Sequence, residues 1–384
     1  MRVLVITNMF PTAAHPSGGV FVSRRLHEHR AAGLDLTAFA LRTTRGPLAR
    51  RAARWAGKAE QLLPPDSAYS DLPVRVSLPA TVLGRRRYVR APVLAASEAL
   101  LRRVEGRYDV VHAHGMYAVP AGAVARRVAA ALDLPYVITA HGTDVHTLMG
   151  SRRDAYATVL RGASRVAYVS EALRQQAVGL GAALQNSVVI PNGVDCDVFQ
   201  PAGREAVRGP HEPVVGFIGN LLPVKGADRL PAIFGEVASR VPGVRFVIVG
   251  SGPLRAHLES ALAPLPVTFT GQVEPGRVPS LIAEMDVVVL PSRQEGWPCI
   301  VLEAHACETP VLASDVGGCA EAVGDASFVV PEGADVEARF AGRLVDVLSQ
   351  PTSPSDLRTR ALQHGWQVIA EKERDMLDQA VAGA

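Results

Sequence analysis

Short apolar runs alternate along the chain with longer segments in which apolar and polar residues mix at helical spacing. The runs in the first half are residues 2–7, 35–41, 109–115, 135–142 and 165–170, and those in the second half are residues 213–220, 245–252, 267–271, 286–292, 310–315 and 327–331. Each run of the second half is short, Val-rich and followed by Gly, Pro, Ser or His, which is typical of buried strands. Strands that alternate with helices predict parallel, doubly wound sheets, so the pattern indicates an α/β fold.

The two sets of predicted strands are separated by residues 191–212, where Pro, Gly and Asp interrupt any apolar period. We therefore expect a first Rossmann-like domain over residues 1–190, a linker over residues 191–212 and a second Rossmann-like domain over residues 213–355. Residues 356–384 are predicted to form a C-terminal helix that packs back toward the first domain, with Trp366 on its apolar side. Parallel sheets that face each other across a cleft bind ligands beyond the carboxyl ends of their strands.

The composition is typical of a soluble globular protein, with 48% hydrophobic and 20% charged residues. No apolar run approaches the roughly 20 residues that a membrane span needs. Asn8 and Pro11 interrupt the first run, which favours a buried strand over a signal peptide, so we expect a cytoplasmic protein. The cysteines have no CxxC spacing, which predicts reduced and mostly buried thiols; they are Cys196, Cys299, Cys307 and Cys319.

The formal net charge is +3, but charged residues are distributed unevenly along the chain. Through residue 190 there are 25 Lys and Arg against 12 Asp and Glu, and afterwards there are 15 against 25. Residues 47–63 combine apolar and basic positions at helical spacing, and residues 84–90 add further Arg. One interpretation is a basic amphipathic helix in peripheral contact with the inner membrane face, and the other is a surface helix packed on its apolar side. No nucleic-acid partner is expected.

Two glutamates surround a predicted helix start in the second half. Glu295 lies in the loop after the strand 286–292, and Glu303 lies within the next helix, which has Pro298 in its first turn. The N-terminus of that helix presents free N–H groups and the positive end of its dipole to an anion. Two acids around such a site suit a nucleotide-sugar, in which a diphosphate separates the hydroxyls of a hexose and a ribose. The alternative is that Glu295 caps the helix and Glu303 is a solvated acid.

Two more loops follow the first predicted strand of each half. Lys225, between Pro223 and Gly226, can reach a diphosphate as a point charge, or it is an ordinary surface lysine. Gly18 and Gly19 permit close approach of the backbone to an anion at a helix start. They do not form G-x-G-x-x-G, which disfavours a nicotinamide cofactor.

Histidines gather after two strands of the first half. His112 and His114 form His-x-His, and His141, Asp144 and His146 follow the next strand. Such a cluster can hold a metal ion, as in metal-dependent hydrolases, but those usually use one eight-fold barrel, whereas this chain divides at a linker. The Asp-x-Asp of residues 195–197 lies in the linker, away from any strand end, so a turn or capping role is predicted for it.

In this order, the loops resemble those of the retaining GT-B glycosyltransferases of the GT4 group. The segments from "GFIGNLLPVKG" through "PSRQEGWPCIVLEAHACETPV" to "ASDVGG" are similar to the nucleotide-sugar domain of that family, and "VHAHG", "ITAHGTD" and "VIPNGVD" are similar to its acceptor domain and linker. The resemblance covers most of the chain, except residues 42–107. It implies a GT-B architecture and a hexosyltransferase.

The resemblance implies a role for each matching residue of the second half. Glu295 would lie near the donor hexose hydroxyls, Glu303 would hold the ribose hydroxyls, and Lys225 would bind the diphosphate. Val273 would offer backbone groups to the base. Backbone N–H groups around Trp297 to Ile300 would meet the sugar or phosphate, with Pro298 and Cys299 lying between these two residues.

For the first half, the resemblance places Gly18 and Gly19 against the phosphate and His141 beside the transferred sugar, with His114 and Asp144 on the acceptor and sugar side. The catalytic set is then His141, Glu295 and Lys225. It implies front-face attack with retention, without a metal or a cofactor, from a UDP- or GDP-sugar to a glycan, a lipid-linked acceptor or a small molecule.

Two positions depart from the family pattern. Asn220 stands where the family often has Arg, so one positive charge near the diphosphate is missing or supplied elsewhere. Glu308 stands where the family commonly has glycine.

Three other functions stay open from the sequence. One is a nucleotide-sugar 2-epimerase on the same architecture, which needs proton-transfer acids and no acceptor. Another is a non-catalytic sugar-binding protein, which the missing export signal disfavours. The last is a metal-dependent hydrolase that uses His112, His114 and His141.

Overall fold

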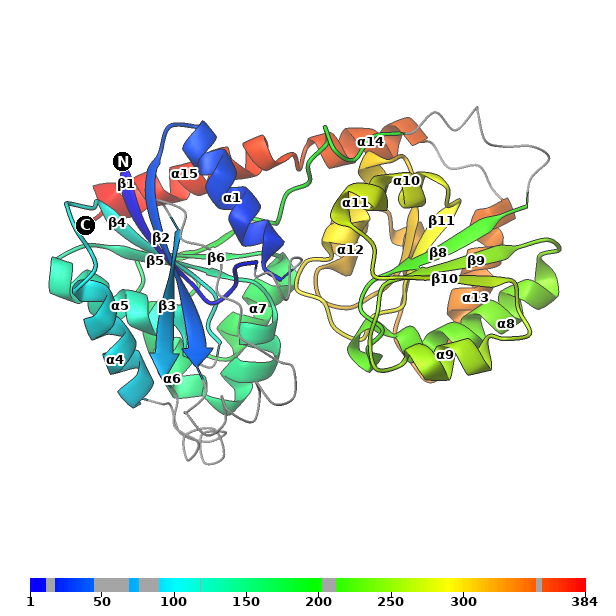
Figure 1. Cartoon of the computed structure of the whole chain (residues 1–384), viewed down its shortest axis with the longest axis horizontal. Helices are drawn as coiled ribbons and strands as arrows, with labels where there is room; N and C mark the ends of the chain where they lie inside the picture. Colours follow the sequence, from blue (N-terminus) through cyan, green and yellow to red (C-terminus); the bar gives the residue numbers. More distant parts are fainter. Residues whose placement is uncertain (12–17, 45–68, 76–89, 118, 202–211, 350–353) are drawn as a thin grey trace. The chain divides into compact units, whose positions relative to one another are not determined.

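The computed structural model describes residues 1–11, 18–44, 69–75, 90–117, 119–201, 212–349 and 354–384. The chain divides into two compact units, one made of residues 1–191 and 369–384 and the other of residues 192–368. Each unit is an α/β layer structure with its own parallel sheet (Figure 1). The basic segments 47–63 and 84–89 lie outside the described residues, and Arg90 begins a helix.

The first unit has a seven-stranded sheet in the order β3-β2-β1-β4-β5-β6-β7, with all pairs parallel. The strands are β1 (Arg2–Thr7), β2 (Asp35–Thr44), β3 (Tyr69–Arg75), β4 (Val110–His114), β5 (Tyr136–Ala140), β6 (Arg165–Tyr168) and β7 (Ser187–Val189). Strand order reverses at β1, which pairs with both β2 and β4, and the carboxyl ends of strands at such a reversal are where α/β sheets bind ligands.

Helices cover both faces of this sheet. They are α1 (Val20–Ala31), α4 (Arg90–Leu101), α5 (Ala121–Leu132), α6 (Arg153–Arg161), α7 (Glu171–Gly179) and most of α15 (Trp366–Ala382), with the π-helix η1 (Asp144–Met149) after β5. Figure 1 shows α1 and α15 on one face of the sheet and α4 and α5 on the other. The last helix of the chain therefore completes the first unit.

The second unit has a six-stranded parallel sheet in the order β10-β9-β8-β11-β12-β13. The strands are β8 (Val214–Ile218), β9 (Arg245–Val249), β10 (Val267–Gly271), β11 (Val287–Leu290), β12 (Val311–Ser314) and β13 (Val329–Val330). The helices are α8 (Leu230–Arg240), α9 (Arg255–Ala261), α10 (Val278–Ala283), α11 (Cys299–Ala306), α12 (Cys319–Val323), α13 (Val336–Ser349) and α14 (Pro354–Leu362), with short 3₁₀ turns at η3 (Pro223–Lys225), η4 (Ala227–Arg229), η5 (Pro275–Arg277) and η6 (Ala326–Phe328). Here the order reverses between β8 and β11.

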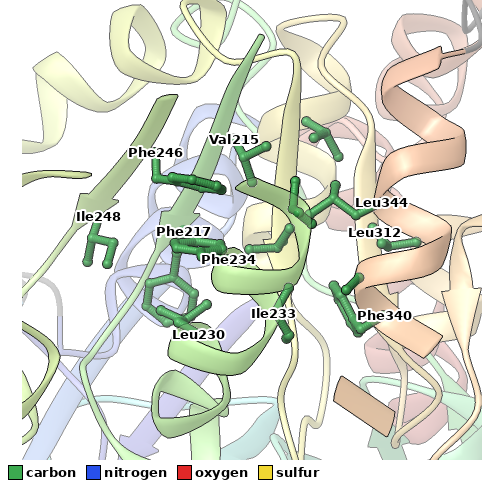
Figure 2. Close-up of a cluster of buried hydrophobic side chains, with 14 of the residues drawn as sticks. Val215, Phe217, Leu230, Ile233, Phe234, Phe246, Ile248, Leu312, Phe340 and Leu344 are labelled. Atoms are coloured by element: carbon green, nitrogen blue, oxygen red, sulfur yellow. The ribbon is translucent and has the colours of Figure 1, made fainter. Parts of the chain in front are cut away.

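One face of the second sheet is buried by α8 and α13. α8 buries residues at i, i+3, i+4 and i+7, which is one stripe of a helix. Phe234 stacks on Phe246 of β9, with ring centroids 4.2 Å apart. Figure 2 shows side chains of both helices and of the strands meeting in one cluster; they include Val215, Phe217, Leu230, Ile233, Phe234, Leu312, Phe340 and Leu344. This packing fixes the position of β8, and Lys225 lies in the loop that follows β8.

The strands predicted from the apolar runs are all present, with bounds that differ from the expected ones by at most three residues. The edge strands β3 and β7 were not among them, because they are short or carry few consecutive apolar residues. β7 ends at Val189, just before the predicted linker of residues 191–212.

The region predicted as one C-terminal helix forms two helices, α14 and α15, separated by residues 363–365. Gly365 forms an isolated bridge with Val194, and Trp366 fills the space above Gly193. Residues 369–384 belong to the first unit. None of the helices in the described part of the chain is long and apolar enough to cross a lipid bilayer.

Candidate functional site

The loops after β8 and β11 meet at the point where the order of the second sheet reverses. Lys225 Nζ lies 2.7 Å from Glu295 Oε1 and 2.8 Å from Glu295 Oε2. Ser292 Oγ donates to Glu295 Oε1 at 2.8 Å. Glu295 is 6% exposed, whereas about a third of the Lys225 side chain is exposed. The sheet topology therefore joins two of the predicted catalytic residues in one ion pair.

Gly226 makes this pairing of loops sterically feasible. Its φ is 66°, in the left-handed region, and a Cβ there would lie 1.7 Å from the carbonyl oxygen of Pro291. Arg229 Nη1 donates to the same oxygen at 2.9 Å. Because only glycine fits between the two loops, Gly226 sets the distance at which Lys225 approaches Glu295.

α11 begins directly after this ion pair. Pro298 is its N-cap residue in extended geometry, and Trp297 is buried with its indole N–H unpaired among the described residues. Asn192 Nδ2 lies 3.7 Å from the Cys299 thiol. Burial raises the pKa of Cys299 to about 12, so it stays a thiol and is not a nucleophile. Ile300, the next residue, is half-buried.

Glu303 lies one turn into α11 and is half-buried. Burial raises its pKa to about 7, and its charge acts on Cys299. It is therefore partly protonated near neutral pH, unlike a solvated surface acid. Glu303 is therefore not a fully solvated acid, and its role in binding a ligand stays a prediction.

Other predicted residues of the second half lie farther from this pair. Asn220 is exposed in the loop after β8, and its carbonyl accepts from Leu222. Val273 is half-buried after β10. Glu308 has φ of 61° and follows the last turn of α11, where its N–H donates to His305. The left-handed backbone explains why glycine is favoured at this position.

In the first unit, Gly18 and Gly19 connect the loop after β1 to α1. Gly19 is the N-cap of α1 with φ of 73°, and a Cβ there would lie 2.6 Å from the carbonyl carbon of Met9. α1 has no side-chain cap at this end. Its first N–H groups are therefore not satisfied by a capping side chain, as an anion-binding helix start requires.

His141 follows β5, beside the end of β4. Its backbone N–H donates to both carboxylate oxygens of Asp144, which also accepts from Gly142 and Val145. Its Nε2 lies 3.3 Å from His114 Nδ1, and its ring lies 4.8 Å from that of Phe21. Burial raises the pKa of Asp144, while these backbone N–H groups oppose the increase. Asp144 thus holds the loop that carries His141.

Three buried histidines of the first unit, His112, His114 and His141, have lowered pKa values, which favours their neutral form. Burial lowers the pKa of His112 to about 4 and holds those of His114 and His141 well below their usual range. The His141 Nδ1 atom is buried and has no hydrogen-bond partner among the described residues. A neutral imidazole here can donate or accept a hydrogen bond, but it cannot supply a positive charge.

Within the described residues, His112, His114 and Glu373 form a group with the spacing of metal ligands, all ligand atoms lying within 4.8 Å of one another. Arg25 Nη1, however, donates to Glu373 Oε1 at 3.0 Å and is itself buried. A guanidinium in contact with a carboxylate oxygen repels a metal ion. It also occupies a lone pair of that oxygen, which the metal ion would need for coordination. The donor set therefore fits a metal ion poorly.

Ser292, Arg25 and Glu373 were not anticipated from the sequence in these contacts. Glu373 could have been found, because it is a lone acid on the apolar stripe of the last helix. Asp195 accepts from the N–H groups of Asp197 and Val198, which confirms the turn role predicted for that segment. All four cysteines are free.

Family models match both halves of the chain. The model described as Glycosyltransferase Family 4 matches residues 18–198, and that described as Glycosyl transferases group 1 matches residues 212–350. A Bacillus subtilis protein, TuaC, named as a teichuronic acid biosynthesis glycosyltransferase, is 29% identical over 84% of this chain and 83% of its own. A D-inositol 3-phosphate glycosyltransferase of Mycobacterium avium is 31% identical over 77% of both chains.

Solved structures share the fold over nearly the whole chain. Sucrose-phosphate synthase from Thermosynechococcus elongatus has a TM-score of 0.76 at 18% identity, covering 100% of both chains. Anabaena HepE, solved with UDP, has a TM-score of 0.71 at 19% identity, covering 98% of this chain and 100% of its own. HepE has also been solved with UDP-glucose. These likenesses establish the two-unit architecture.

Proposed function

Because the chain belongs to the glycosyltransferases of family 4 and group 1, with the GT-B architecture, we propose that it is a retaining hexosyltransferase that uses a nucleotide diphosphate sugar. The acceptor provides a hydroxyl. The observation that carries the proposal is the Lys225–Glu295 pair at the reversal point of the second sheet, directly before the N-terminus of α11. It combines a cation, an acid and free helix N–H groups at one place.

The second unit binds the nucleotide part of the donor in this proposal. Glu303 accepts hydrogen bonds from the ribose hydroxyls, and the backbone of Val273 contacts the base. The diphosphate lies at the first turn of α11, beside Trp297 and Ile300. UDP is the first nucleotide to test, because structures of the neighbour HepE have been solved with UDP and with UDP-glucose. GDP is the second.

Lys225 stabilises the leaving group. Its ammonium has three N–H donors, and the contacts with Glu295 leave one available on the exposed part of the side chain. As the bond from the anomeric carbon to the β-phosphate oxygen breaks, negative charge grows on the phosphate, which this proton and the helix N-terminus stabilise. Asn220 is neutral, so Lys225 is the cation proposed for this task.

His141 acts on the transferred sugar. Its buried Nδ1 has no hydrogen-bond partner among the described residues, so binding of the sugar must bring a hydroxyl to that atom, and the neutral state of the ring suits hydrogen bonding over proton transfer. Attack from the front face then joins the acceptor oxygen to the anomeric carbon while the leaving phosphate takes the acceptor's proton. Glu295 is assigned to the hexose hydroxyls and not to the role of nucleophile; its carboxylate has lone pairs beyond those that contact Lys225. No metal ion takes part in this mechanism.

The acceptor is a glycan, a lipid-linked saccharide or a small molecule. Two relatives are named for teichuronic acid biosynthesis and for D-inositol 3-phosphate, and an acid and a phosphate are both anionic. The excess of basic residues before position 190 suits an anionic acceptor. We propose an acceptor of this charge, and a cytoplasmic protein that meets it there or at the inner membrane face.

The test compares His141→Ala with wild type. We expect turnover with a UDP- or GDP-sugar and a panel of hydroxyl acceptors to fall about 10²–10⁴-fold, while affinity for the nucleoside diphosphate stays near wild type. Mass spectrometry identifies the product, and NMR of its anomeric centre reports retention. Melting temperature is measured on the same preparation.

Near-normal turnover of folded His141→Ala protein would contradict the assignment. Donor conversion to an epimer without any acceptor would instead identify a 2-epimerase, and inversion at the anomeric carbon would exclude retention.

A further inference from the structure

One face of α1 touches two distant parts of the first unit. Phe21, Arg25 and His29 are four residues apart, so they lie along one stripe of the helix. Phe21 contacts the ring of His141, whereas Arg25 and His29 contact the carboxylate of Glu373. Arg25 also donates to the carbonyl groups of residues 190 and 191. The helix therefore connects Glu373, on α15, with the histidine proposed to meet the sugar.

Glu373 is a fully buried carboxylate with both oxygens occupied. Oε1 accepts from Arg25 at 3.0 Å and from Thr139 Oγ1 at 3.4 Å, and Oε2 lies 2.8 Å from His29 Nε2. Burial acts to raise the pKa of Glu373, but Arg25 and His29 outweigh burial and hold the pKa well below its usual range. Apolar residues of similar volume often stabilise a fold as well as a buried ion pair does. Stability alone therefore does not account for Glu373.

A row of polar groups leads from Glu373 toward His141. Thr139 Oγ1 lies 2.9 Å from His112 Nε2, which is 3.5 Å from Glu373 Oε1. Because an ionised carboxylate only accepts, the Thr139 hydroxyl donates to Glu373 and in turn accepts from His112 Nε2–H. The rings of His112 and His114 lie 4.2 Å apart between centroids, and His114 Nδ1 reaches His141 Nε2.

In the hydrogen bond between His114 Nδ1 and His141 Nε2, either ring can be the donor, because both rings are neutral. The bond therefore has two proton arrangements. When His114 donates, the proton of His141 is on Nδ1; when His141 donates, its Nδ1 is a bare acceptor. In both cases the unpaired Nδ1 is the atom left for a ligand. A ring nitrogen of His114 lies within 4.8 Å of the Glu373 carboxylate, whose charge makes the two arrangements unequal in energy.

We propose that Glu373 is a positioning residue for His141. The charge of Glu373, close to the ring of His114, selects one proton arrangement of the hydrogen bond between His114 and His141, so His141 Nδ1 presents one defined hydrogen-bonding group to the sugar. The identity of that ligand rests on the proposed function, but the proton arrangement is a property of the protein alone. The last helix then serves the reaction without touching the substrate.

The test compares Glu373→Gln with Glu371→Gln in the full chain. Both make the same chemical change on α15, but Glu371 is exposed and Glu373 is buried. Nitrogen-15 chemical shifts of the imidazoles report which nitrogen carries the proton. We expect one tautomer of His114 and of His141 in wild type and in Glu371→Gln, and a mixed or reversed population in Glu373→Gln. Turnover of Glu373→Gln falls about tenfold or more, with an unchanged KM for the donor.

A double variant covers the case in which Glu373→Gln fails to fold because Arg25 has lost its carboxylate partner. Arg25→Met with Glu373→Leu removes both charges and retains apolar volume. It is expected to fold and to show the same loss of a single tautomer and of turnover. Wild-type tautomers and turnover in either folded variant would overturn the inference.

A stoichiometric metal ion in the purified protein, lost in Glu373→Gln, would also overturn the inference, because the cluster would then be a metal site. Failure of the proposed function is separately visible. In that case wild type transfers no sugar, and the tautomer comparison by itself decides whether Glu373 controls His141.

Discussion

At the scale of single residues, Glu308 is in a backbone conformation that its side chain disfavours. Its φ of 61° follows the C-terminus of α11, where Thr309 N–H also donates back to Ala304. Left-handed backbone costs a residue with a Cβ about 1 kcal/mol or more, whereas glycine adopts it freely. The family preference for glycine at this position thus has a local cause.

Glu308→Gly is expected to raise the free energy of unfolding by about 1 kcal/mol, because the Cβ is removed from the left-handed position. Urea denaturation measures the change. Glu308→Ala is the matched control, since it removes the same charge and retains the Cβ. An equal gain in both variants would attribute the effect to charge instead.

Glu303 gives the proposed donor site a pH dependence. Burial raises its pKa to about 7, and the ionised form is the better acceptor for ribose hydroxyls. Affinity for UDP should therefore rise with pH through about 7. The raised pKa also means that Glu303 favours folding at low pH and that this contribution is lost as pH increases from about 4.5 to about 7.

Calorimetry with UDP between pH 5.5 and 8.5 measures this dependence. In Glu303→Gln, affinity at pH 8 is expected to be weaker and the remaining pH profile to reflect only the nucleotide's own phosphate. A wild-type profile that matches the variant's would show that Glu303 does not contact the nucleotide.

At the scale of elements, α8 is held by an aromatic contact that periodicity alone does not specify. The stripe of Leu230, Ile233, Phe234 and Val237 predicts a buried face, but not that Phe234 stacks on Phe246 at an interplanar angle of 20°. The helix follows the Lys225 loop directly, so its packing fixes that loop. Loss of this contact should therefore affect the stability of the second unit.

Phe234→Ala is expected to lower the free energy of unfolding by about 3–5 kcal/mol, because it removes a buried ring and leaves a cavity. Glu236→Ala, exposed on the same helix, should change it by less than about 0.5 kcal/mol. Chemical denaturation of both variants measures these changes in the free energy of unfolding. A small effect of Phe234→Ala would mean that the cluster in Figure 2 collapses around the missing ring.

At the scale of the whole molecule, the proposed mechanism uses fixed protein charges in place of a metal ion. Lys225 and the start of α11 supply positive charge. In the His112–His114–Glu373 group, the Glu373 carboxylate is already paired with the Arg25 guanidinium, so the group fits a metal ion poorly. Sugar transfer should therefore persist in excess chelator. Turnover is measured after dialysis against the chelator and again after adding Mg²⁺ or Mn²⁺. Complete loss that either ion restores would refute the metal-free mechanism.

The sequence by itself determined the α/β class and most strand positions, because buried parallel strands are short apolar runs whatever their neighbours. It also placed Lys225 and Glu295 after such strands. Only the tertiary structure decided that β8 and β11 are adjacent, which joins those side chains, since strand order is not written in local periodicity. It also brought Glu373, more than 230 residues along the chain from Thr139, into a buried cluster with Arg25. A lone acid in an apolar stripe shows that a partner is needed, but only the packing of α15 on the first unit supplies that partner.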